Sequence, residues 1–157
     1  MLRLHTLAPM RLTQAALSVL LNNRQGAIVN VSSVASFLYS AGSVNYCASK
    51  AYLTTFTEGL AAELRGTGVH AQALCPGFTR TEFHQRMTAG GDPRAAGRPR
   101  LLWMTAESVV RASLRRLEHG GPVVCIPGLR YKLIIGLVRL LPRRAIGVMT
   151  GRRHRRV

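Results

Sequence analysis

The fold is decided between Ala27 and Leu74 by the sequence AIVNVSSVASFLYSAGSVNYCASKAYLTTFTEGLAAELRGTGVHAQAL. It begins with a short β-rich run, Ala27 to Val31, which is long enough for a buried strand. A helical pattern then extends from Val44 to Arg65 and ends at a glycine-rich turn. A second apolar run, Val69 to Leu74, predicts another strand. Because a helix separates the two strands, the stretch predicts an α/β unit with a parallel sheet.

The flanking sequence extends this α/β pattern in both directions. Apolar residues at helical spacing predict a helix from Arg11 to Leu21, and a second helix is expected from Ala106 to Glu118. A third strand, Val123 to Ile126, follows the turn after that helix, whereas Ser32 to Ser43 reads as a loop. With 157 residues and 47% apolar content, the chain is long enough for one domain with a core.

The chain is strongly basic, with 22 Lys and Arg against 6 Asp and Glu and a formal net charge of +16. A solvated arginine-rich surface is one interpretation, and attraction to an anionic membrane or a nucleic acid is the alternative. The cysteines Cys47, Cys75 and Cys125 lie in apolar segments and are expected to be buried free thiols. Neither they nor the histidines have the spacing of metal ligands, so no metal site is expected.

Tyr46 and Lys50 are the residues that indicate chemistry. They are four residues apart, so a helix would place both on one face, one turn apart. A nearby ammonium favours a phenolate, which makes tyrosine a usable general acid and base near neutral pH. Hydroxyl groups lie upstream at Ser32 and Ser33. This combination indicates proton transfer at an alcohol or carbonyl oxygen.

Three motifs resemble those of the short-chain dehydrogenase/reductase family, in its classical form, and they occur here in the family's order. They are Asn30-Val31-Ser32-Ser33 at the end of a strand, Tyr46-x-x-x-Lys50 on a helix, and Pro76-Gly77-Phe78-Thr79-Arg80-Thr81 after the next strand. The resemblance implies the C-terminal part of a Rossmann-like, doubly wound parallel sheet. It also implies an oxidoreductase that interconverts a carbonyl and an alcohol with NAD or NADP.

The same resemblance assigns roles to three catalytic residues. Tyr46 matches the tyrosine that exchanges a proton with the substrate oxygen. Lys50 matches the lysine that binds the ribose hydroxyls of the nicotinamide half and stabilises the phenolate. Ser33, rather than Ser32, matches the serine that hydrogen-bonds the substrate oxygen.

The resemblance also implies a cofactor-binding turn. Pro76 and Gly77 match the turn that brings backbone close to the nicotinamide, while Tyr46 and Lys50 contribute to the same site. Thr79 and Thr81 match positions that contact the carboxamide or the pyrophosphate, although they could equally be plain turn or capping residues.

The chain departs from the family pattern near its start. The family's fourth catalytic residue is an asparagine, and its position falls at His5, which could serve a proton relay. A complete member has roughly 250 residues and opens with a strand, a glycine-rich turn and a helix that hold the pyrophosphate. We expect the chain to be truncated before Met1. The sequence Gly66-Thr67-Gly68-Val69-His70-Ala71 matches a dinucleotide motif but follows a helix, so we interpret it as a helix C-cap.

Residues 1–129 are predicted to form the catalytic domain, with a substrate loop at about 79–100. Residues 130–157 are predicted to be an apolar and basic extension. This segment could be a helix packed on the domain with a charged end, or a helix that contacts a membrane surface. No apolar run is long enough for an ordinary transmembrane helix.

The expected partner is a small, apolar carbonyl or alcohol substrate, in a cytoplasmic protein that could also associate with a membrane surface. The family resemblance further implies a homo-oligomer formed through helices 11–21 and 44–65. The alternative is an inactive remnant that only self-associates or binds a membrane surface. Aromatic and basic residues are not interleaved as in proteins that stack nucleic-acid bases, which argues against a nucleic acid partner.

Overall fold

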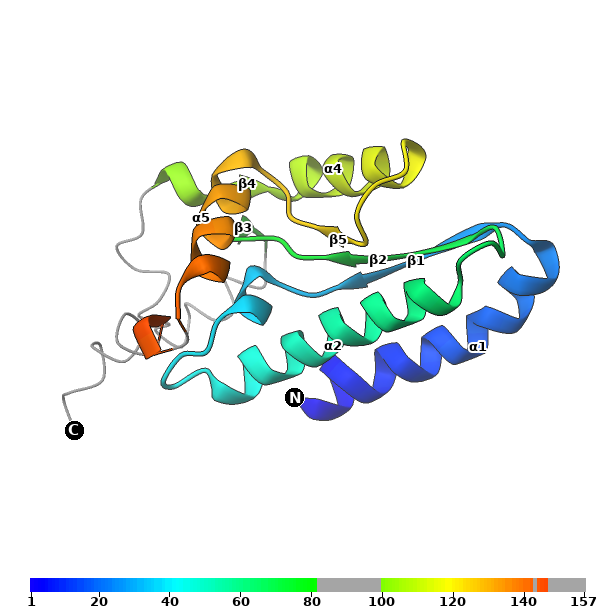
Figure 1. Ribbon diagram of the computed structural model, residues 1–157, viewed down its shortest axis with the longest axis horizontal. Helices are drawn as coiled ribbons and strands as arrows, with labels where there is room; N and C mark the ends of the chain where they lie inside the picture. Colours follow the sequence, from blue (N-terminus) through cyan, green and yellow to red (C-terminus); the bar gives the residue numbers. More distant parts are fainter. Residues whose placement is uncertain (82–99, 143, 147–157) are drawn as a thin grey trace.

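A computed structural model describes residues 1–81, 100–142 and 144–146 (Figure 1). In chain order, the helices and helical turns are η1 (Arg3–Leu7), α1 (Ala8–Asn23), η2 (Val34–Phe37), α2 (Val44–Glu63), η3 (Arg100–Leu102), α4 (Ala106–Glu118) and α5 (Leu129–Leu140). The strands are β1 (Gly26–Val31), β2 (Val69–Leu74), β3 (Thr79–Arg80), β4 (Met104–Thr105) and β5 (Val124–Cys125).

A parallel sheet in the order β1-β2-β5 forms the centre of the molecule. Gly26 of β1 is paired with Val69 of β2, and the register continues to the pair of Val31 and Leu74. Helices α1 and α2 cover one face of this sheet and α4 covers the other, as Figure 1 shows. The predicted α/β class with a parallel, doubly wound sheet is therefore confirmed.

Two of the predicted elements have their predicted bounds and the others differ: β1 begins one residue earlier, at Gly26, α2 ends at Glu63 rather than Arg65, and β5 is limited to Val124–Cys125. β2 and α4 have the predicted bounds, whereas α1 begins at Ala8 and follows the π-helical turn η1, so helical structure starts well before Arg11. The loop predicted at residues 32–43 contains the 3-10 turn η2. Pro9 is tolerated because the first turn of a helix has amide groups without intrahelical partners.

The prediction that β1 is a buried strand is wrong. Val29 is 37% exposed and Val31 is 54% exposed. The reason is that both side chains point to the face opposite Asn30, where α4 packs on β2 and β5 and leaves the edge strand β1 uncovered. Asn30 is the exception, since it is buried and its side-chain amide donates to the hydroxyl of Thr57 on α2 at 3.0 Å.

The turn after α2 confirms that the glycines at 66 and 68 end a helix. Both have positive φ angles, +78° for Gly66 and +82° for Gly68. A side chain at Gly68 would also meet the carbonyl oxygen of Arg24, which itself has a positive φ at the end of α1. The end of α1 therefore packs directly against the turn that joins α2 to β2, and the dinucleotide-like sequence follows a helix end instead of opening a helix.

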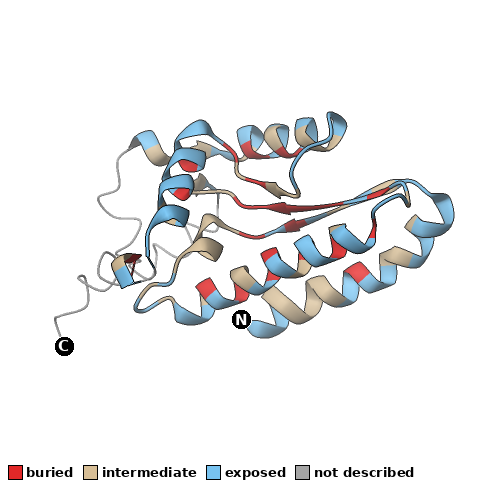
Figure 2. Cartoon of the chain, viewed as in Figure 1, coloured by how far each residue is buried: buried red, intermediate tan, exposed pale blue. Residues whose placement is uncertain are grey.

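Two apolar clusters hold the layers together. One lies between the sheet and the helix pair, and its buried members are Leu60, Leu64, Val69 and Ala71, with Leu17, Leu20, Ile28 and Ala61 packed around them. The other joins the sheet to α4 through Leu74, Val109 and Cys125, with Met104 beside them. Figure 2 shows the buried residues concentrated on the strands and on the inward sides of the helices.

Two short strands, β3 and β4, form a separate parallel pair beyond the end of β2, with Thr79 opposite Met104. The predicted substrate loop at 79–100 lies mostly at residues 82–99, outside the described residues. Helix α5 packs near the carboxyl ends of β1 and β2 (Figure 1), and its Tyr131 and Ile135 are buried.

Candidate active site

The candidate site lies where β1 and β2 end. The amide of Ser32 donates to the carbonyl of Leu74 at 2.7 Å, and the amide of Val34 donates to the carbonyl of Pro76 at 3.0 Å. These bonds continue the strand pairing beyond the sheet and hold the serine segment beside the Pro76 turn. In parallel α/β sheets, the carboxyl ends of the strands are where ligands usually bind.

Ser32 and Ser33 have different environments. Ser32 is buried, and its hydroxyl donates to the backbone carbonyl of Lys50 at 2.8 Å and lies 2.8 Å from the hydroxyl of Thr54. Ser33 is half-buried and caps η2 by accepting the amide of Ala35 at 3.1 Å. Ser32 therefore anchors β1 to α2, whereas Ser33 retains a hydroxyl proton that it can donate to a ligand.

Tyr46 and Lys50 lie on the first half of α2, as their spacing predicts. The Lys50 Nζ is 5.9 Å from the centroid of the Tyr46 ring, and it donates to the carbonyl of Val31 at 2.9 Å. This contact fixes the ammonium group at the end of β1, one residue before the serine pair. Burial lowers the pKa of Lys50, and the nearby Cys75 thiol acts in the opposite direction.

His5 lies beside these residues although it is more than forty positions away from them in the sequence. Its Nδ1 is 3.3 Å from the hydroxyl of Ser49, and its ring meets the ring of Tyr46 edge-on with the centroids 5.8 Å apart. Burial lowers the pKa of His5 most, followed by the positive charges of Lys50 and of the N-terminal amine. These causes favour a neutral imidazole, which has both a donor and an acceptor nitrogen.

The turn after β2 is held closely by its surroundings. The Thr79 hydroxyl donates to the carbonyl of Gly77 at 3.1 Å, so Thr79 closes the turn on itself. The amide of Phe78 donates to the hydroxyl of Tyr131 on α5 at 2.9 Å. Thr81 is exposed and lies just after β3, immediately before the first residue that is not described.

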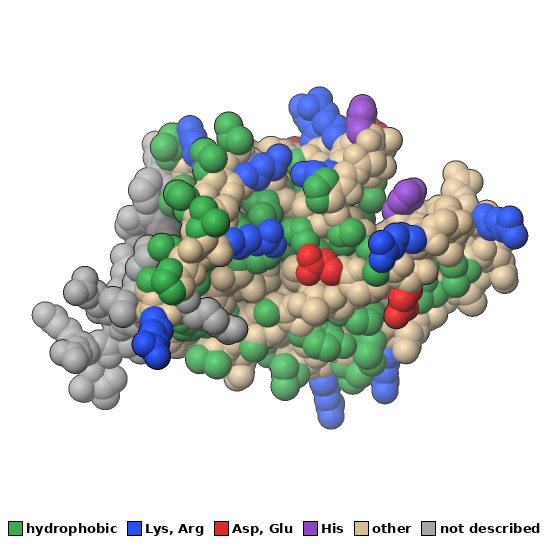
Figure 3. All heavy atoms as spheres, in the orientation of Figure 1, with side chains coloured by type: hydrophobic (Ala, Val, Ile, Leu, Met, Phe, Trp, Pro, Cys, Tyr) green, Lys and Arg blue, Asp and Glu red, His purple; other side chains and the backbone are tan. Residues whose placement is uncertain are grey.

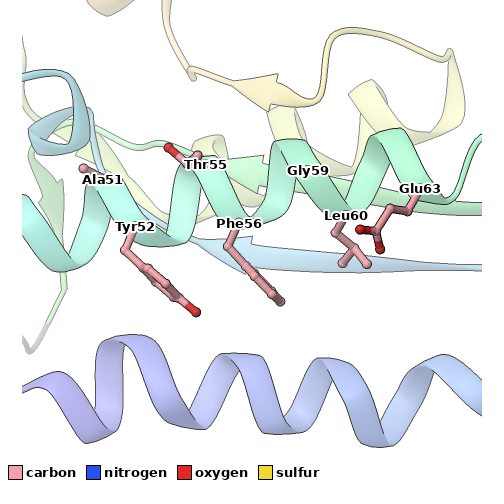
Figure 4. A pocket seen from close by; sticks show the side chains of 7 residues that line it. All are labelled: Ala51, Tyr52, Thr55, Phe56, Gly59, Leu60 and Glu63. Atoms are coloured by element: carbon pink, nitrogen blue, oxygen red, sulfur yellow. The ribbon is translucent and has the colours of Figure 1, made fainter.

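Surface hollows lie near α2, and one of about 360 Å³ is lined by η1, the start of α1 and α2. Two others are larger. One, of about 640 Å³, is enclosed by residues 36–41, α2 and the end of α5, and it is mainly apolar. The other, of about 560 Å³, is lined by α2 alone, where Tyr52 and Phe56 point to the same side (Figure 4). Neither is lined by Ser33, Tyr46 or Lys50.

Comparison with known families gives a match over residues 1–91, to the model described as short chain dehydrogenase. This match covers more than half of the chain and includes Ser33, Tyr46, Lys50 and the turn after β2. The chain belongs to the short-chain dehydrogenase family.

Individual members of the short-chain dehydrogenase family match over parts of their length. A 3-oxoacyl-(acyl-carrier-protein) reductase of Vibrio cholerae is 40% identical over 73 residues, which are 46% of this chain and 30% of the relative. An uncharacterised oxidoreductase of Myxococcus xanthus is 46% identical over 69 residues, which are 44% of this chain and 27% of the relative. The aligned segments are therefore about a third or less of these curated relatives.

Solved structures of short-chain dehydrogenases extend the likeness to nearly the whole chain. A short-chain dehydrogenase from Sphingobium yanoikuyae in complex with NADPH has a TM-score of 0.69 and 30% identity, covering 99% of this chain and 57% of that one. One from Burkholderia cenocepacia in complex with NADP has a TM-score of 0.74 and 26% identity, covering 93% and 57%. The chain thus spans little more than half the length of these relatives.

The structure brings together most of the residues singled out in the sequence. Ser33, Tyr46, Lys50 and His5 lie around the first half of α2, and Pro76 is hydrogen-bonded to the residue after Ser33. Thr81 does not join this group among the described contacts. The sequence alone did not single out Ser49, whose hydroxyl lies beside His5 and donates to the backbone carbonyl of Tyr46. Its position between Tyr46 and Lys50 was the feature of the sequence that could have indicated it.

In the part of the chain that the structure describes, His, Cys, Asp and Glu side chains do not gather in a group of three that could hold a metal ion. Within the same residues, every helix is too short or too polar to cross a membrane. The three cysteines are buried free thiols, as predicted.

Proposed function

We propose that the protein is an oxidoreductase that interconverts a carbonyl and an alcohol with a nicotinamide cofactor, either NAD or NADP. One observation carries this proposal: Tyr46 and Lys50 share one face of α2 at the end of β1, with the ammonium 5.9 Å from the phenol ring. Membership of the short-chain dehydrogenase family supports it, as do relatives whose solved structures hold NADP or NADPH.

Tyr46 is proposed as the general acid and base. In the reducing direction, a bound reduced nicotinamide would supply the hydride to the carbonyl carbon, while the phenol of Tyr46 would give its proton to the carbonyl oxygen. The products are an alcohol, an oxidised nicotinamide and a phenolate, which water then reprotonates. The hydroxyl of Ser33, whose oxygen already accepts the Ala35 amide, donates its proton to the same substrate oxygen as negative charge develops there.

The proposed cofactor site uses donors that the fold leaves available. Lys50 has three ammonium protons and gives one to the carbonyl of Val31, so further protons can bind ribose hydroxyls. When bound, the nicotinamide supplies the hydride. Pro76, Gly77, Thr79 and Thr81 are proposed to lie along the nicotinamide and pyrophosphate. His5 is proposed to relay protons through Ser49 towards this site.

Cofactor binding tests the proposal directly. Titration of the purified protein with NADH and with NADPH, followed by nicotinamide fluorescence, should give micromolar binding for one or both. The Tyr46→Phe variant should bind the cofactor equally well but reduce ketones about 10²- to 10⁴-fold more slowly, because it lacks the proton. Tyr52→Phe, at a position of α2 whose hydroxyl faces Met10 of α1, should match the wild type. An unchanged rate in Tyr46→Phe would contradict the assignment.

The substrate is proposed to be a small apolar carbonyl or alcohol. The apolar hollow of about 640 Å³ between residues 36–41, α2 and α5 lies on the same helix as Tyr46 and supports this choice. Reduction rates for ketones of increasing apolar size test the class, and a preference for charged substrates would contradict it. A cytoplasmic location and the division into residues 1–129 and 130–157 stay predictions, which cell fractionation and limited proteolysis can check.

Self-association through α1 and α2 is proposed for the same protein. The outer surface of α1 carries Leu12, which is 71% exposed, and Val19, which is 59% exposed. Exposed apolar side chains in a row on one helix are typical of an interface with another protein surface. Sedimentation velocity measures the oligomeric state, and a monomer at micromolar concentration would refute the proposal.

Contact with a membrane surface is the second candidate, favoured by the outward side of α5. Leu133, Leu137 and Leu140 are 61%, 65% and 83% exposed, and cations lie on the same helix. Figure 3 shows hydrophobic and basic side chains gathered over α5. Sedimentation with anionic and with neutral vesicles tests this contact, and Leu133→Gln should weaken it. Equal recovery in the supernatant with and without vesicles would exclude it.

A further inference from the structure

Tyr131 of α5 connects segments that are far apart in the sequence. Its side chain is 6% exposed, and its hydroxyl makes two hydrogen bonds. The oxygen accepts the amide proton of Phe78 at 2.9 Å, and the hydroxyl proton is donated to the carbonyl of Leu102 at 2.8 Å. A tyrosine hydroxyl has a single proton, so its donor capacity is used in full at this place.

The Tyr131 ring also explains why residue 77 is a glycine. A Cβ atom built on Gly77 would lie 2.0 to 2.3 Å from three carbons of the ring. Neither the backbone of Gly77 nor the buried ring of Tyr131 can move easily to relieve such contacts. The ring therefore lies directly against the backbone of the turn, and a glycine is required by close approach rather than by its backbone angles.

The turn that Tyr131 holds is coupled to the candidate catalytic serine. The carbonyl of Phe78 accepts the amide of Met104 at 2.8 Å, so both backbone groups of Phe78 are bonded. The carbonyl of Pro76 accepts the amide of Val34, the residue after Ser33, at 3.0 Å. A shift of the turn would therefore be transmitted to the segment that carries Ser33.

We propose that Tyr131 is a positioning residue, which holds the backbone of residues 76–79 in the position from which this turn contacts the nicotinamide. This inference rests on the proposed function, because it assumes that the turn contacts the cofactor. Tyr131 acts through Gly77 and Phe78 rather than on the substrate. Its loss should consequently weaken cofactor binding more than it slows the proton transfer at Tyr46.

The Tyr131→Phe variant tests the inference because it removes both hydrogen bonds and keeps the ring against Gly77. The KM for the reduced nicotinamide should rise about tenfold, since a largely buried amide loses its acceptor, while kcat should stay within about twofold. The Phe78 amide should exchange with deuterium faster than in the wild type, and this readout needs no activity. Lys132→Gln, an exposed neighbour on α5, should change neither quantity.

A double-mutant cycle with Gly77→Ala provides a second test. Gly77→Ala alone should raise the cofactor KM strongly, because the new methyl group displaces the Tyr131 ring. In the Tyr131→Ala background the same change should cost clearly less, since the obstructing ring is absent. Additive effects in this cycle would contradict the close packing on which the inference depends.

The outcomes separate this inference from the proposed function. If the wild type reduces ketones but Tyr131→Phe has an unchanged cofactor KM, Tyr131 is not a positioning residue and the oxidoreductase assignment stands. If faster exchange at Phe78 occurs without a change in KM, the hydroxyl supports the fold alone, which also overturns the inference. If the wild type binds neither NADH nor NADPH, the proposed function and the inference fail together.

Discussion

His5 illustrates how a single residue gains its properties from its neighbours. In the sequence it occupies the position of an expected asparagine, and in the structure it lies against Tyr46 and Ser49. The burial of the ring and, after it, the positive charge of Lys50 lower the pKa of His5 and disfavour the imidazolium form. A neutral histidine at this place can accept a proton from a water or a hydroxyl and release it to another group. An asparagine does not take up the proton and can only orient a water by hydrogen bonds.

The lowered pKa of His5 predicts a pH dependence of stability. The folded protein binds the His5 proton more weakly than the unfolded chain, whose histidine titrates near 6.5. The free energy of unfolding should therefore increase as pH rises from the folded pKa to about 6.5, and the full cost of protonation is present below that window. Urea unfolding at several pH values between 5 and 8 measures this increase.

His5→Asn supplies the comparison, because asparagine does not titrate. The difference in unfolding free energy between wild type and variant should rise across the same window and become constant above it. A pH-independent difference between wild type and His5→Asn would show that the folded environment does not act on this imidazole.

At the scale of elements, the end of α1 packs against the turn between α2 and β2, and this contact connects both helices to the sheet. Arg24 ends α1 in the left-handed conformation, and its carbonyl lies directly against Gly68 at the start of β2. Gly66 also has a positive φ, but open space surrounds the position of a Cβ atom there. A side chain at Gly66 would therefore cause backbone strain alone, whereas a side chain at Gly68 would cause both backbone strain and a steric clash.

Alanine substitutions at these glycines should have different effects. Gly66→Ala should lower the free energy of unfolding by about 1 to 2 kcal/mol, from the left-handed backbone alone. Gly68→Ala should cost about 3 kcal/mol or more, because its methyl group also meets the Arg24 carbonyl. Chemical denaturation gives both values. Equal losses in the two variants would mean that the end of α1 does not pack against Gly68 as described.

At the scale of the whole molecule, much apolar surface stays exposed. β1 is an edge strand of the described sheet with Val29 and Val31 open to solvent, and the outer side of α1 carries Leu12. An unpaired strand edge and exposed apolar helix faces both favour association. The chain is therefore predicted to be oligomeric or prone to aggregation when isolated.

A charge introduced on the outer surface of α1 distinguishes association through α1 from non-specific aggregation. Leu12→Glu should shift the sedimentation distribution of the purified protein towards smaller species, because a carboxylate would be buried in the proposed interface. Val110→Glu changes a 53% exposed apolar residue on α4 and should leave the distribution unchanged. If both variants have the wild-type distribution, association does not use α1.

The sequence by itself determined the order and type of the main elements and the shared helix face of Tyr46 and Lys50. β2 and α4 could be predicted to the residue, because local periodicity and flanking turn residues define a helix or strand. The shared face of Tyr46 and Lys50 follows from a four-residue spacing on a helix. These properties depend on neighbours along the chain.

Contacts between distant segments were decided by the tertiary structure. The exposure of β1 depends on which helices cover its faces, and the packing of Tyr131 on Gly77 joins residues more than fifty positions apart. The lowered pKa of His5 likewise arises from burial of the ring and from the nearby charge of Lys50. No local pattern encodes such contacts, because each arises only when the layers pack and exclude water around particular pairs of groups.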